Sequence, residues 1–257
     1  MFGINKNKKS SGNPRQSALA RHEERISNLP VGRTGASRVE EELLCPADTD
    51  NEIESWRIFK IMAELVSGFE LLRGYDLAAT IFGSARCIPD SNVYAIAENL
   101  GSQLAKEGFT VITGGGGGVM DAANKGAKDA GGRSVGLNIE LSTKQSPNGN
   151  TTDGMQFHYF FTRKVMLSFS SEVYIFFPGG FGTLDEFFEM LTLVQTKKVK
   201  PLPIILIGKN FWSPLIAWFE ETLKNDYRTI DESDMKIYTI VDTADEAMAE
   251  IRKRLTL

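Results

Sequence analysis

From Leu77 onward the chain alternates between two hydrophobic patterns. Short apolar runs have the length and composition of buried β-strands, and they lie at 77–84, 109–118, 133–139, 156–161, 172–177, 202–208 and 236–241. Longer stretches between them space their apolar residues as amphipathic helices do, at 92–108, 119–132, 162–171, 184–198, 211–225 and 244–255. The pattern therefore predicts strands and helices in alternation.

Such an alternation predicts βαβ units and a mainly parallel sheet. Strands that are apolar throughout need helices on both faces of the sheet, because a single covered face would leave half of each strand in water. The expected fold is a doubly wound, Rossmann-like α/β domain. The pattern does not specify the order of its strands.

The part of the chain before this alternation divides into two segments. Residues 54–72 place apolar residues at helical intervals, which predicts an amphipathic helix packed on the following domain: Trp56, Phe59, Met62, Val66, Phe69 and Leu72. Residues 1–50 mix Lys and Arg with Gly, Ser, Asn and Pro, which is typical of a flexible basic tail, with docking onto a partner subunit as the alternative. We expect a tail, 1–50, and a single domain, 51–257.

Composition narrows the class of protein. The 257-residue chain has a net charge of −4, which gives no reason to expect nucleic acid or an anionic membrane as a partner. Its two cysteines form no CxxC pair and its two histidines are too few for a histidine-rich metal centre, so we expect no metal and no disulfide framework. The first residues do not resemble a secretory signal, and no segment approaches the ~20 apolar residues of a membrane span, so we expect neither feature. We expect a soluble, cytoplasmic protein.

Three glycine-bearing turns follow predicted strands: FGSAR (82–86), TGGGGGVM (113–120) and PGGFGT (178–183). Ligands of doubly wound folds bind at the carboxyl ends of the strands, where glycine permits a close approach and a helix start offers free N–H groups to an anion. One such turn could be steric in origin, but three together indicate a phosphate-bearing ligand. The candidate binding residues in the first two turns are Gly83, Ser84, Gly115, Gly116, Gly117, Gly118 and Met120.

Two common nucleotide motifs do not fit these turns. G-x-G-x-x-G fails in GGGGGVM because Val119 or a later residue takes the sixth position, and G-x-x-x-x-G-K-[ST] is absent. Neither a dinucleotide nor ATP hydrolysis is favoured. A mononucleotide or a sugar phosphate remains.

The third turn opens a longer stretch, PGGFGTLDE (178–186), which resembles the PGGxGTxxE motif of the LOG ("lonely guy") family of cytokinin-activating phosphoribohydrolases. TRK (162–164) resembles the Arg-Lys step of that family's second motif, although Phe160 and Phe161 replace its usual Met-His. GGGGGVMDAANKGA resembles its glycine-rich turn and helix. The resemblance covers residues 77 to 250 and implies hydrolysis of the N-glycosidic bond of a nucleoside 5′-monophosphate, of AMP or cytokinin riboside type. The loop ELSTKQSPNGN lacks a clear match to the glutamate of plant members, so no particular base is implied.

The resemblance also implies roles for individual residues. Arg163 and Glu186 correspond to the family's essential pair, and Lys164 to the basic neighbour of the arginine. Gly179, Gly180, Gly182 and Thr183 correspond to the phosphate-cradling loop, and Thr192 to a threonine that helps to bind nucleotide. No cofactor is implied.

Glu186 has two interpretations. Thr183-Leu184-Asp185-Glu186 fits a T-x-x-E capping box, which is the stronger interpretation from local sequence alone, whereas the resemblance favours catalysis. The positive end of the helix dipole favours the ionised form of a glutamate in the first turn, which suits stabilisation of an oxocarbenium-like transition state and activation of water, and argues against proton donation. Arg163 keeps its charge and is expected to clamp phosphate or substrate. No general acid is identified.

Two other functions remain open. Molybdenum-cofactor carrier proteins look similar in fold and have a related glycine turn but bind without turnover; the Arg163–Glu186 pair favours the enzyme. Lysine decarboxylation needs pyridoxal phosphate on a lysine, and no lysine lies in a recognisable context for it. The expected partners are a nucleoside monophosphate and further copies of the chain, in a homodimer or larger assembly, because helices 54–72 and 183–197 offer more apolar face than one sheet surface needs.

Overall fold

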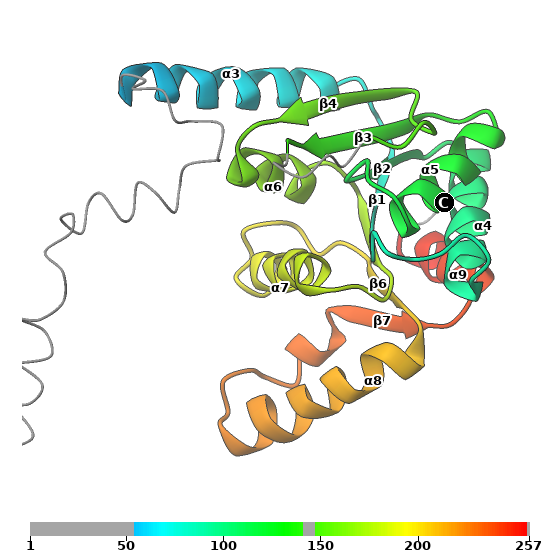
Figure 1. Cartoon of the computed structure of the whole chain (residues 1–257). Coiled ribbons are helices and arrows are strands. Elements are labelled where there is room, and N and C mark those ends of the chain that lie inside the picture. The colour runs from blue at the N-terminus through cyan, green and yellow to red at the C-terminus, as the bar shows by residue number, and fades with distance from the viewer. Residues whose placement is uncertain (1–53, 141–146, 256–257) are drawn as a thin grey trace, which may run out of the picture. The chain divides into compact units, whose positions relative to one another are not determined.

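The computed structural model describes residues 54–140 and 147–255, and in these ranges it contains one seven-stranded sheet (Figure 1). The strands are β1 (Ala78–Phe82), β2 (Thr110–Thr113), β3 (Ser134–Ile139), β4 (Asp153–Phe157), β5 (Val173–Phe176), β6 (Ile204–Ile207) and β7 (Tyr238–Val241). Their order is β4-β3-β2-β1-β5-β6-β7, and each described pair is parallel. The expected doubly wound, Rossmann-like architecture is confirmed.

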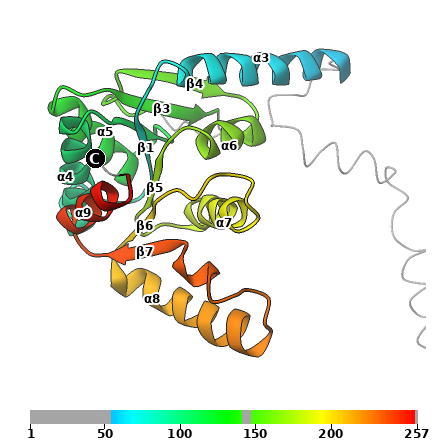
Figure 2. The same cartoon turned by 180° about the vertical axis from the view of Figure 1, so that it is seen from behind.

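Helices cover both faces of this sheet (Figures 1 and 2). One face carries α4 (Asn92–Lys106), α5 (Val119–Asp129) and α9 (Ala244–Leu255). The other carries α6 (Phe160–Ser168), α7 (Phe181–Gln195) and α8 (Lys209–Trp218), with α8 continuing as the π-helix η1 (Phe219–Asp226), and the 3₁₀ helix η2 (Asp234–Lys236) precedes β7. None of the described helices is long and apolar enough to span a membrane.

The two cores explain the apolar strands. Successive side chains of a strand point to opposite faces, so Ile81 of β1 packs with α4, α5 and α9, while Phe82 packs with α6, α7 and α8. All five residues of β1 are buried for this reason. Phe187 of α7 is central to the second core, with its ring centroid 5.4 Å from that of Phe176 and 5.1 Å from that of Trp212. The sheet therefore provides a fixed base for the turns at its carboxyl edge.

The sequence prediction of a strand over 156–161 is wrong in its second half. β4 ends at Phe157, and α6 begins at Phe160. The carboxylate of Glu64, far away in the sequence, accepts hydrogen bonds from the backbone N–H groups of His158 and Tyr159. A carboxylate at these N–H groups favours the start of a helix, and this tertiary contact overrides the strand preference of an aromatic run.

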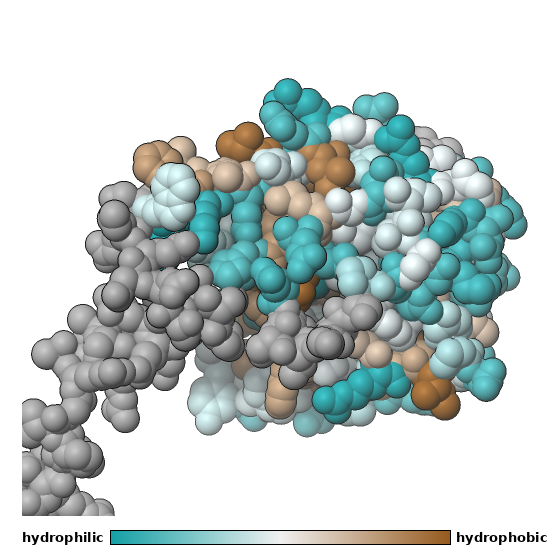
Figure 3. Space-filling view, turned by 45° about the horizontal axis from the view of Figure 1, so that its top comes forward, coloured by the Kyte–Doolittle hydropathy of each residue, from teal (hydrophilic) through white to brown (hydrophobic). Residues whose placement is uncertain are grey.

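α3 (Glu54–Leu72) packs against α6 and β4, but not through the predicted face. Its contacts come from Leu65, Gly68, Leu71 and Leu72. The other five residues of the predicted apolar stripe are between 49% and 60% exposed: Trp56, Phe59, Met62, Val66 and Phe69. The N-terminal part of α3 extends past the end of α6 (Figures 1 and 2), and Figure 3 shows apolar patches on the face that carries α3. The predicted packing face is wrong, and the described residues of the chain leave the apolar stripe exposed.

The predicted tail, residues 1–50, lies outside the described residues, as do residues 141–146 of the loop between β3 and β4.

Candidate active site

A cleft of about 940 Å³ opens at the carboxyl ends of β1, β2, β3 and β5. β1 lies between β2 and β5 in the sheet, so the three glycine turns follow neighbouring strands although they are far apart in the sequence. The predicted site residues that line the cleft are Gly83, Ser84, Gly115, Gly116, Met120, Arg163, Gly179, Gly180, Gly182, Thr183 and Glu186. The fold thus brings together both members of the predicted catalytic pair and all three turns.

Four predicted residues are not among those that line this cleft: Gly117, Gly118, Lys164 and Thr192. Gly118 is the N-cap of α5 with a φ of +66°. The Lys164 Nζ atom lies 2.6 Å from Asp185 Oδ2 and 3.0 Å from Glu189 Oε2. Thr192 lines a separate hollow of about 140 Å³ between α7 and η1, and its hydroxyl donates to the Phe188 carbonyl.

The cleft also has lining residues that the sequence analysis did not select, including Arg86, Gly114, Asn138, Gln156, Phe160 and Phe181. Arg86 and Gly114 belong to turns that were already recognised, and Phe181 occupies the variable position of PGGFGT. Asn138 and Gln156 carry no local signal, because their place in the cleft depends on the order of β3 and β4 in the sheet. Among the residues that the structure describes, no group of His, Cys, Asp and Glu is arranged to hold a metal ion.

The glycine turn after β2 is held by asparagine side chains. In the orientation of the Asn138 side-chain amide that satisfies both its oxygen and its nitrogen, the nitrogen donates to the carbonyl oxygens of Gly114 and Gly115 at 3.1 Å each. Asn148 donates from its backbone N–H to the Gly115 oxygen at 2.9 Å and from Nδ2 to the Gly116 oxygen at 2.8 Å. These carbonyls are occupied by protein donors, whereas residues 54–140 and 147–255 offer no acceptor for the Gly116 N–H. The turn can therefore donate to a ligand.

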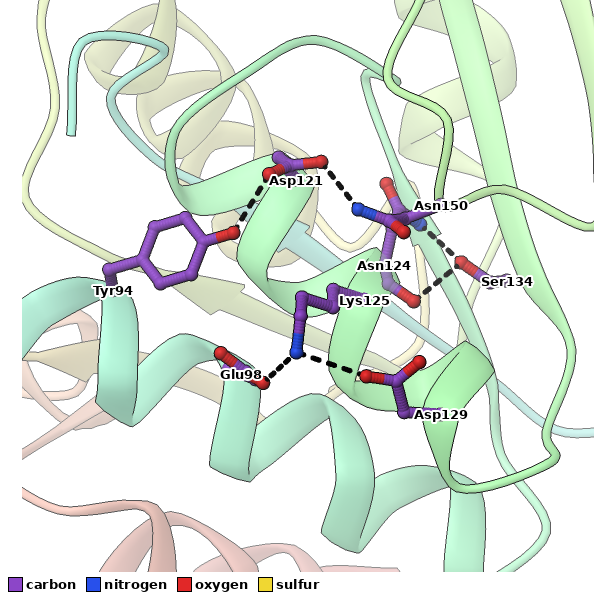
Figure 4. A network of polar contacts seen from close by, with 8 residues as sticks. All are labelled: Tyr94, Glu98, Asp121, Asn124, Lys125, Asp129, Ser134 and Asn150. Carbon is purple, nitrogen blue, oxygen red and sulfur yellow. Dashed lines mark hydrogen bonds and ion pairs between the residues drawn. The ribbon is translucent and has the colours of Figure 1, made fainter. Parts of the chain in front are cut away.

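A buried polar network fixes α5 beneath this turn (Figure 4). The fully buried Asn124 accepts from Thr113 Oγ1 at 2.6 Å and donates to Ser134 Oγ at 2.8 Å, which joins α5 to β2 and β3. Asp121 accepts from the Tyr94 hydroxyl and from Asn150 Nδ2, both at 2.8 Å. Burial and the bond to Asp121 raise the pKa of Tyr94 to about 12, so its hydroxyl keeps its proton and remains a donor. The network makes the start of α5 a rigid part of the cleft.

α7 begins three residues before the predicted capping box. Its first residue is Phe181 and its N-cap is Gly180, which makes no side-chain cap bond. Thr183 and Glu186 are consequently the third and sixth residues of the helix, so Glu186 cannot close a capping box and the cap interpretation is wrong. No acceptor in the described part of the chain binds the N–H groups of Phe181, Gly182 and Thr183. α7 thus starts at the cleft without a side-chain cap. α5 also lacks a side-chain cap and brings its second residue, Met120, to the cleft, although the N–H of its first residue, Val119, donates to the Ser84 carbonyl.

Glu186 is buried, with 7% of its surface exposed, and its Oε2 atom has no hydrogen-bond partner among the described residues. Burial raises the pKa of Glu186 from 4.5 to about 7, against a lowering effect of the Lys164 charge. The expected place of Glu186 in the first turn, where the helix dipole would favour its ionised form, is wrong, because Glu186 lies in the second turn and the dipole acts mainly within the first. Near neutral pH the carboxyl group occurs in both protonation states.

The Arg163 side chain is fixed in the cleft by contacts with a backbone carbonyl and with an aromatic ring. Its Nε donates to the Leu137 carbonyl at 2.7 Å, and its guanidinium carbon lies 5.9 Å from the centroid of the Phe160 ring. The guanidinium also lies against Gly114, where an added Cβ would be 2.3 Å from Nη2. Burial lowers the pKa of Arg163 and the nearby Glu186 raises it, but arginine remains charged at neutral pH. The cleft therefore holds a fixed cation near a buried carboxyl group.

Two glycines at the start of α7, Gly180 and Gly182, have no packing reason to be glycine. An added Cβ at Gly179 would clash with the Thr183 side chain, whereas at Gly180 or Gly182 it would meet no atom of the described residues within 4 Å. Neither Gly180 nor Gly182 has a positive φ. Folding does not require glycine at these two positions, but the close approach of a ligand to the backbone would.

We expect Gly182→Ala to leave the fold intact and to weaken nucleotide binding. The free energy of unfolding should stay the same or rise by about 0.4–1 kcal/mol, because alanine restricts the unfolded chain. The affinity for AMP should fall about tenfold or more, since each 1.4 kcal/mol of lost contact costs that factor. Chemical denaturation and calorimetry measure both. Gly149→Ala, which is equally open but does not line the cleft, is the matched control; normal AMP binding by Gly182→Ala would contradict a ligand at this helix start.

The fold and cleft define a Rossmann-type α/β protein whose site lies at the carboxyl ends of its strands. A family model described as "Possible lysine decarboxylase" matches residues 120–251, just over half of the chain, and this range includes Arg163 and Glu186. The chain belongs to this family, the LOG family. The predicted family membership is confirmed.

Several proteins are similar in sequence to half of this chain or more. A cytokinin riboside 5′-monophosphate phosphoribohydrolase of Mycobacterium tuberculosis is 29% identical over 164 residues, which cover 60% of this chain and 82% of that protein. The enzyme of the same name from Rhodococcoides fascians is 26% identical over 155 residues, 59% of this chain and 78% of its own. An uncharacterised protein of Archaeoglobus fulgidus is 33% identical over 131 residues, 50% of this chain and 82% of its own.

Solved structures share the architecture. A protein solved as a structural-genomics target superposes with a TM-score of 0.53 at 25% identity, covering 69% of this chain and 99% of that one. The molybdenum cofactor carrier protein of Chlamydomonas reinhardtii has the same TM-score at 23% identity, covering 70% and 99%. At that identity the second similarity shows the fold alone.

Proposed function

We propose that the protein hydrolyses the N-glycosidic bond of a nucleoside 5′-monophosphate, releasing free base and ribose 5-phosphate. The observation that carries the proposal is the convergence of two uncapped helix starts, a fixed arginine and a buried carboxyl group on one cleft. Helix starts favour a phosphate, and the relatives from Mycobacterium tuberculosis and Rhodococcoides fascians are named for this reaction.

The chemistry assigns Glu186 to the sugar and the helix starts to the phosphate. As the C1′–N bond breaks, its electron pair leaves with the base and positive charge develops on the ribose, which the Glu186 carboxylate stabilises. The oxygen of a water molecule then bonds to C1′, and Glu186 takes its proton. The reaction is balanced when that proton is returned to the base nitrogen, and a pKa of about 7 suits transfer in both directions. Arg163 orients the bound substrate.

The structure disfavours lysine decarboxylation, despite the description of the family model. Pyridoxal phosphate would need a lysine within the cleft, and no lysine is among the described residues that line it. Lys164 directly follows the cleft residue Arg163, but its ammonium group is paired with Asp185 and Glu189. Burial acts to lower the pKa of Lys164, but the bonds to these two carboxylates outweigh it and the pKa is raised. A free, low-pKa amine is the form that Schiff-base chemistry needs, and Lys164 is the opposite. Lys144 lies outside the described residues.

A non-catalytic carrier is the second candidate, since the carrier protein of Chlamydomonas reinhardtii shares the fold. The environment of Glu186 favours the enzyme, because burying a carboxyl group without a partner destabilises the fold and such groups concentrate in active sites. Incubation with a panel of nucleoside 5′-monophosphates, followed by chromatography of the products, tests the choice. We expect free base and ribose 5-phosphate in equal amounts from at least one nucleotide. Binding of nucleotides without release of base from any of them would contradict the proposal and favour the carrier.

We also propose that copies of the chain associate through α3. Two copies of α3 crossing antiparallel near Ala63 would place Trp56 of one copy against Phe69 of the other, and Phe59 against Val66, so that larger side chains meet smaller ones. Such a two-fold contact is self-complementary, and it would cover the exposed stripe of α3.

We expect light scattering at micromolar concentration to give a mass well above the 28.4 kDa of one chain. Phe59→Asp should lower that mass without unfolding the protein, because Phe59 is 60% exposed in the single chain. Tyr227→Asp, at an exposed aromatic residue away from α3, should leave it unchanged. A wild-type protein with the mass of one chain would contradict the association, and so would a Phe59→Asp mass equal to that of wild type.

A further inference from the structure

α6, the helix that carries Arg163, does not cap its own N-terminus. Its N-cap residue, Tyr159, makes no side-chain cap bond. The carboxylate of Glu64 on α3 lies there instead. Its Oε1 accepts from the His158 N–H at 2.6 Å, and its Oε2 accepts from the Tyr159 N–H at 3.3 Å and from the Thr162 hydroxyl at 2.6 Å. Of these donors, only the N–H of the N-cap residue Tyr159 is one of the free N–H groups of α6, and Glu64 bonds to it from a distant helix as the glutamate of a capping box would do locally.

This contact is firm for three reasons. An acidic side chain at a helix start is stabilised by the free N–H groups and by the helix dipole. Thr162 is fully buried, so its bond to Glu64 is shielded from water. One turn further along both helices, Gly68 lies so close to Met166 that an added Cβ would be 2.5 Å from the sulfur. α3 is therefore seated on α6 at two successive turns.

The cap lies next to the cleft. Thr162 immediately precedes Arg163, whose Nε is held by the Leu137 carbonyl and whose guanidinium fits against Gly114. An α-helix is stiff over one turn, so a shift at the first turn of α6 moves Arg163 relative to β3 and to the glycine turn. α3 itself lies outside residues 120–251, the range that the family model matches.

We propose that Glu64 is a positioning residue for the active site: by capping α6 from α3, it fixes Arg163 in the cleft. Glu64 does not line the cleft and acts only through α6. The inference rests on the proposed function for its effect on turnover, but its structural part can be tested without any turnover.

The test compares Glu64→Ala and Glu64→Gln with wild type. Glu70→Gln is the matched control, since Glu70 is an exposed acidic residue of the same helix that forms no hydrogen bond to the described residues of α6. Hydrogen exchange of residues 158–168 should speed up about fivefold in Glu64→Ala, the factor that a lost cap of about 1 kcal/mol gives. Modification of Arg163 by phenylglyoxal, followed by mass spectrometry, should speed up by a similar factor. Glutamine retains one acceptor oxygen, so both rates in Glu64→Gln should lie between those of Glu64→Ala and wild type.

Measurement of kcat distinguishes a positioning role of Glu64 from a purely stabilising one, because a residue that only stabilises α6 would leave kcat of the folded protein unchanged. Well below the melting temperature, where all variants are folded, kcat for AMP should fall about ten- to hundredfold in Glu64→Ala, as expected when a substrate-orienting group is misplaced by about 1 Å. Unchanged exchange and unchanged Arg163 modification would overturn the proposal. Faster exchange with wild-type kcat would also overturn it, since Glu64 would then only stabilise α6. A wild-type protein that releases no base would refute the proposed function instead, and the modification rate of Arg163 would still decide the role of Glu64.

Discussion

Replacing Glu186 with glutamine will abolish turnover and, at about pH 8, make the protein harder to unfold. Glutamine has nearly the same size but cannot stabilise an oxocarbenium ion or take a proton from water, so kcat should fall by about three orders of magnitude or more, in the range found for groups that act directly on the reacting atoms. AMP should still bind. Steady-state kinetics and calorimetry measure the two effects separately.

The stability effect of Glu186→Gln follows from the raised pKa of the carboxyl group. Its pKa is about 7 in the folded protein against an ordinary value of 4.5, so between these values the folded state holds a proton that the unfolded chain releases. Stability therefore falls as the pH rises through this interval, and the full cost is present above about pH 7. At 1.36 kcal/mol per pKa unit the cost is about 3 kcal/mol. Glutamine avoids it, so the variant's advantage should be near zero at low pH and largest above neutral pH.

Denaturant unfolding at about pH 4.5 and about pH 8 checks this difference. Glu70→Gln is the control, because it removes an exposed carboxylate that does not line the cleft. Near-normal turnover by Glu186→Gln would remove Glu186 from the mechanism. A variant that is less stable than wild type at about pH 8 would show that the carboxylate is ionised and well paired in the folded state, contrary to its environment here.

Arg163→Lys should be nearly as harmful to turnover as loss of the side chain, although it keeps the charge. Lysine has no second donor group with which to bond the Leu137 carbonyl while its charge faces the cleft, so both the anchor and the orientation of the cation are lost. We expect kcat/KM for AMP to fall about 10²- to 10³-fold. Leaving the Leu137 carbonyl without a donor should cost about 1–3 kcal/mol in the free energy of unfolding.

Arg133→Lys is the matched control for this substitution. Arg133 makes the same two kinds of contact, donating from Nη1 to the Gly74 carbonyl at 2.9 Å and lying 5.5 Å from the centroid of the Tyr75 ring, but it does not line the cleft. Its replacement should reduce stability modestly and leave kcat/KM unchanged. An Arg163→Lys variant with wild-type kcat/KM would show that the guanidinium does not orient the substrate.

Much of the fold could be predicted from the sequence, because a strand that is buried on both faces is apolar at nearly every position and a covering helix is apolar on one face. The strands ending at Phe82, Thr113 and Phe176 and the glycines that follow them were all recognised, and with them most of the cleft. What the pattern could not supply were contacts between distant segments. The aromatic run at 156–161 ends as the start of a helix because Glu64 binds there, and Asn138 reaches the glycine turn because β3 pairs with β2.

The candidate site shows the same limit at Glu186. T-x-x-E is a valid capping pattern, but the preceding Gly180 takes the N-cap position, and local sequence cannot decide between two start points one turn apart. The misplaced start also caused the wrong expectation about ionisation, since it put Glu186 in the first turn, where the dipole would dominate. The apolar stripe of α3 was misassigned for a related reason: periodicity identifies an apolar face but not what covers it.

The most direct test of the central claim compares AMP with adenosine as substrates of the wild-type protein. The claim is that the cleft binds a 5′-phosphate at the starts of α5 and α7 and uses that binding energy for cleavage of the N-glycosidic bond. Removal of the phosphate takes away several charge-assisted hydrogen bonds. The kcat/KM for adenosine should therefore be lower than that for AMP by a factor of about 10² or more. Release of adenine from both substrates at equal kcat/KM would contradict the account.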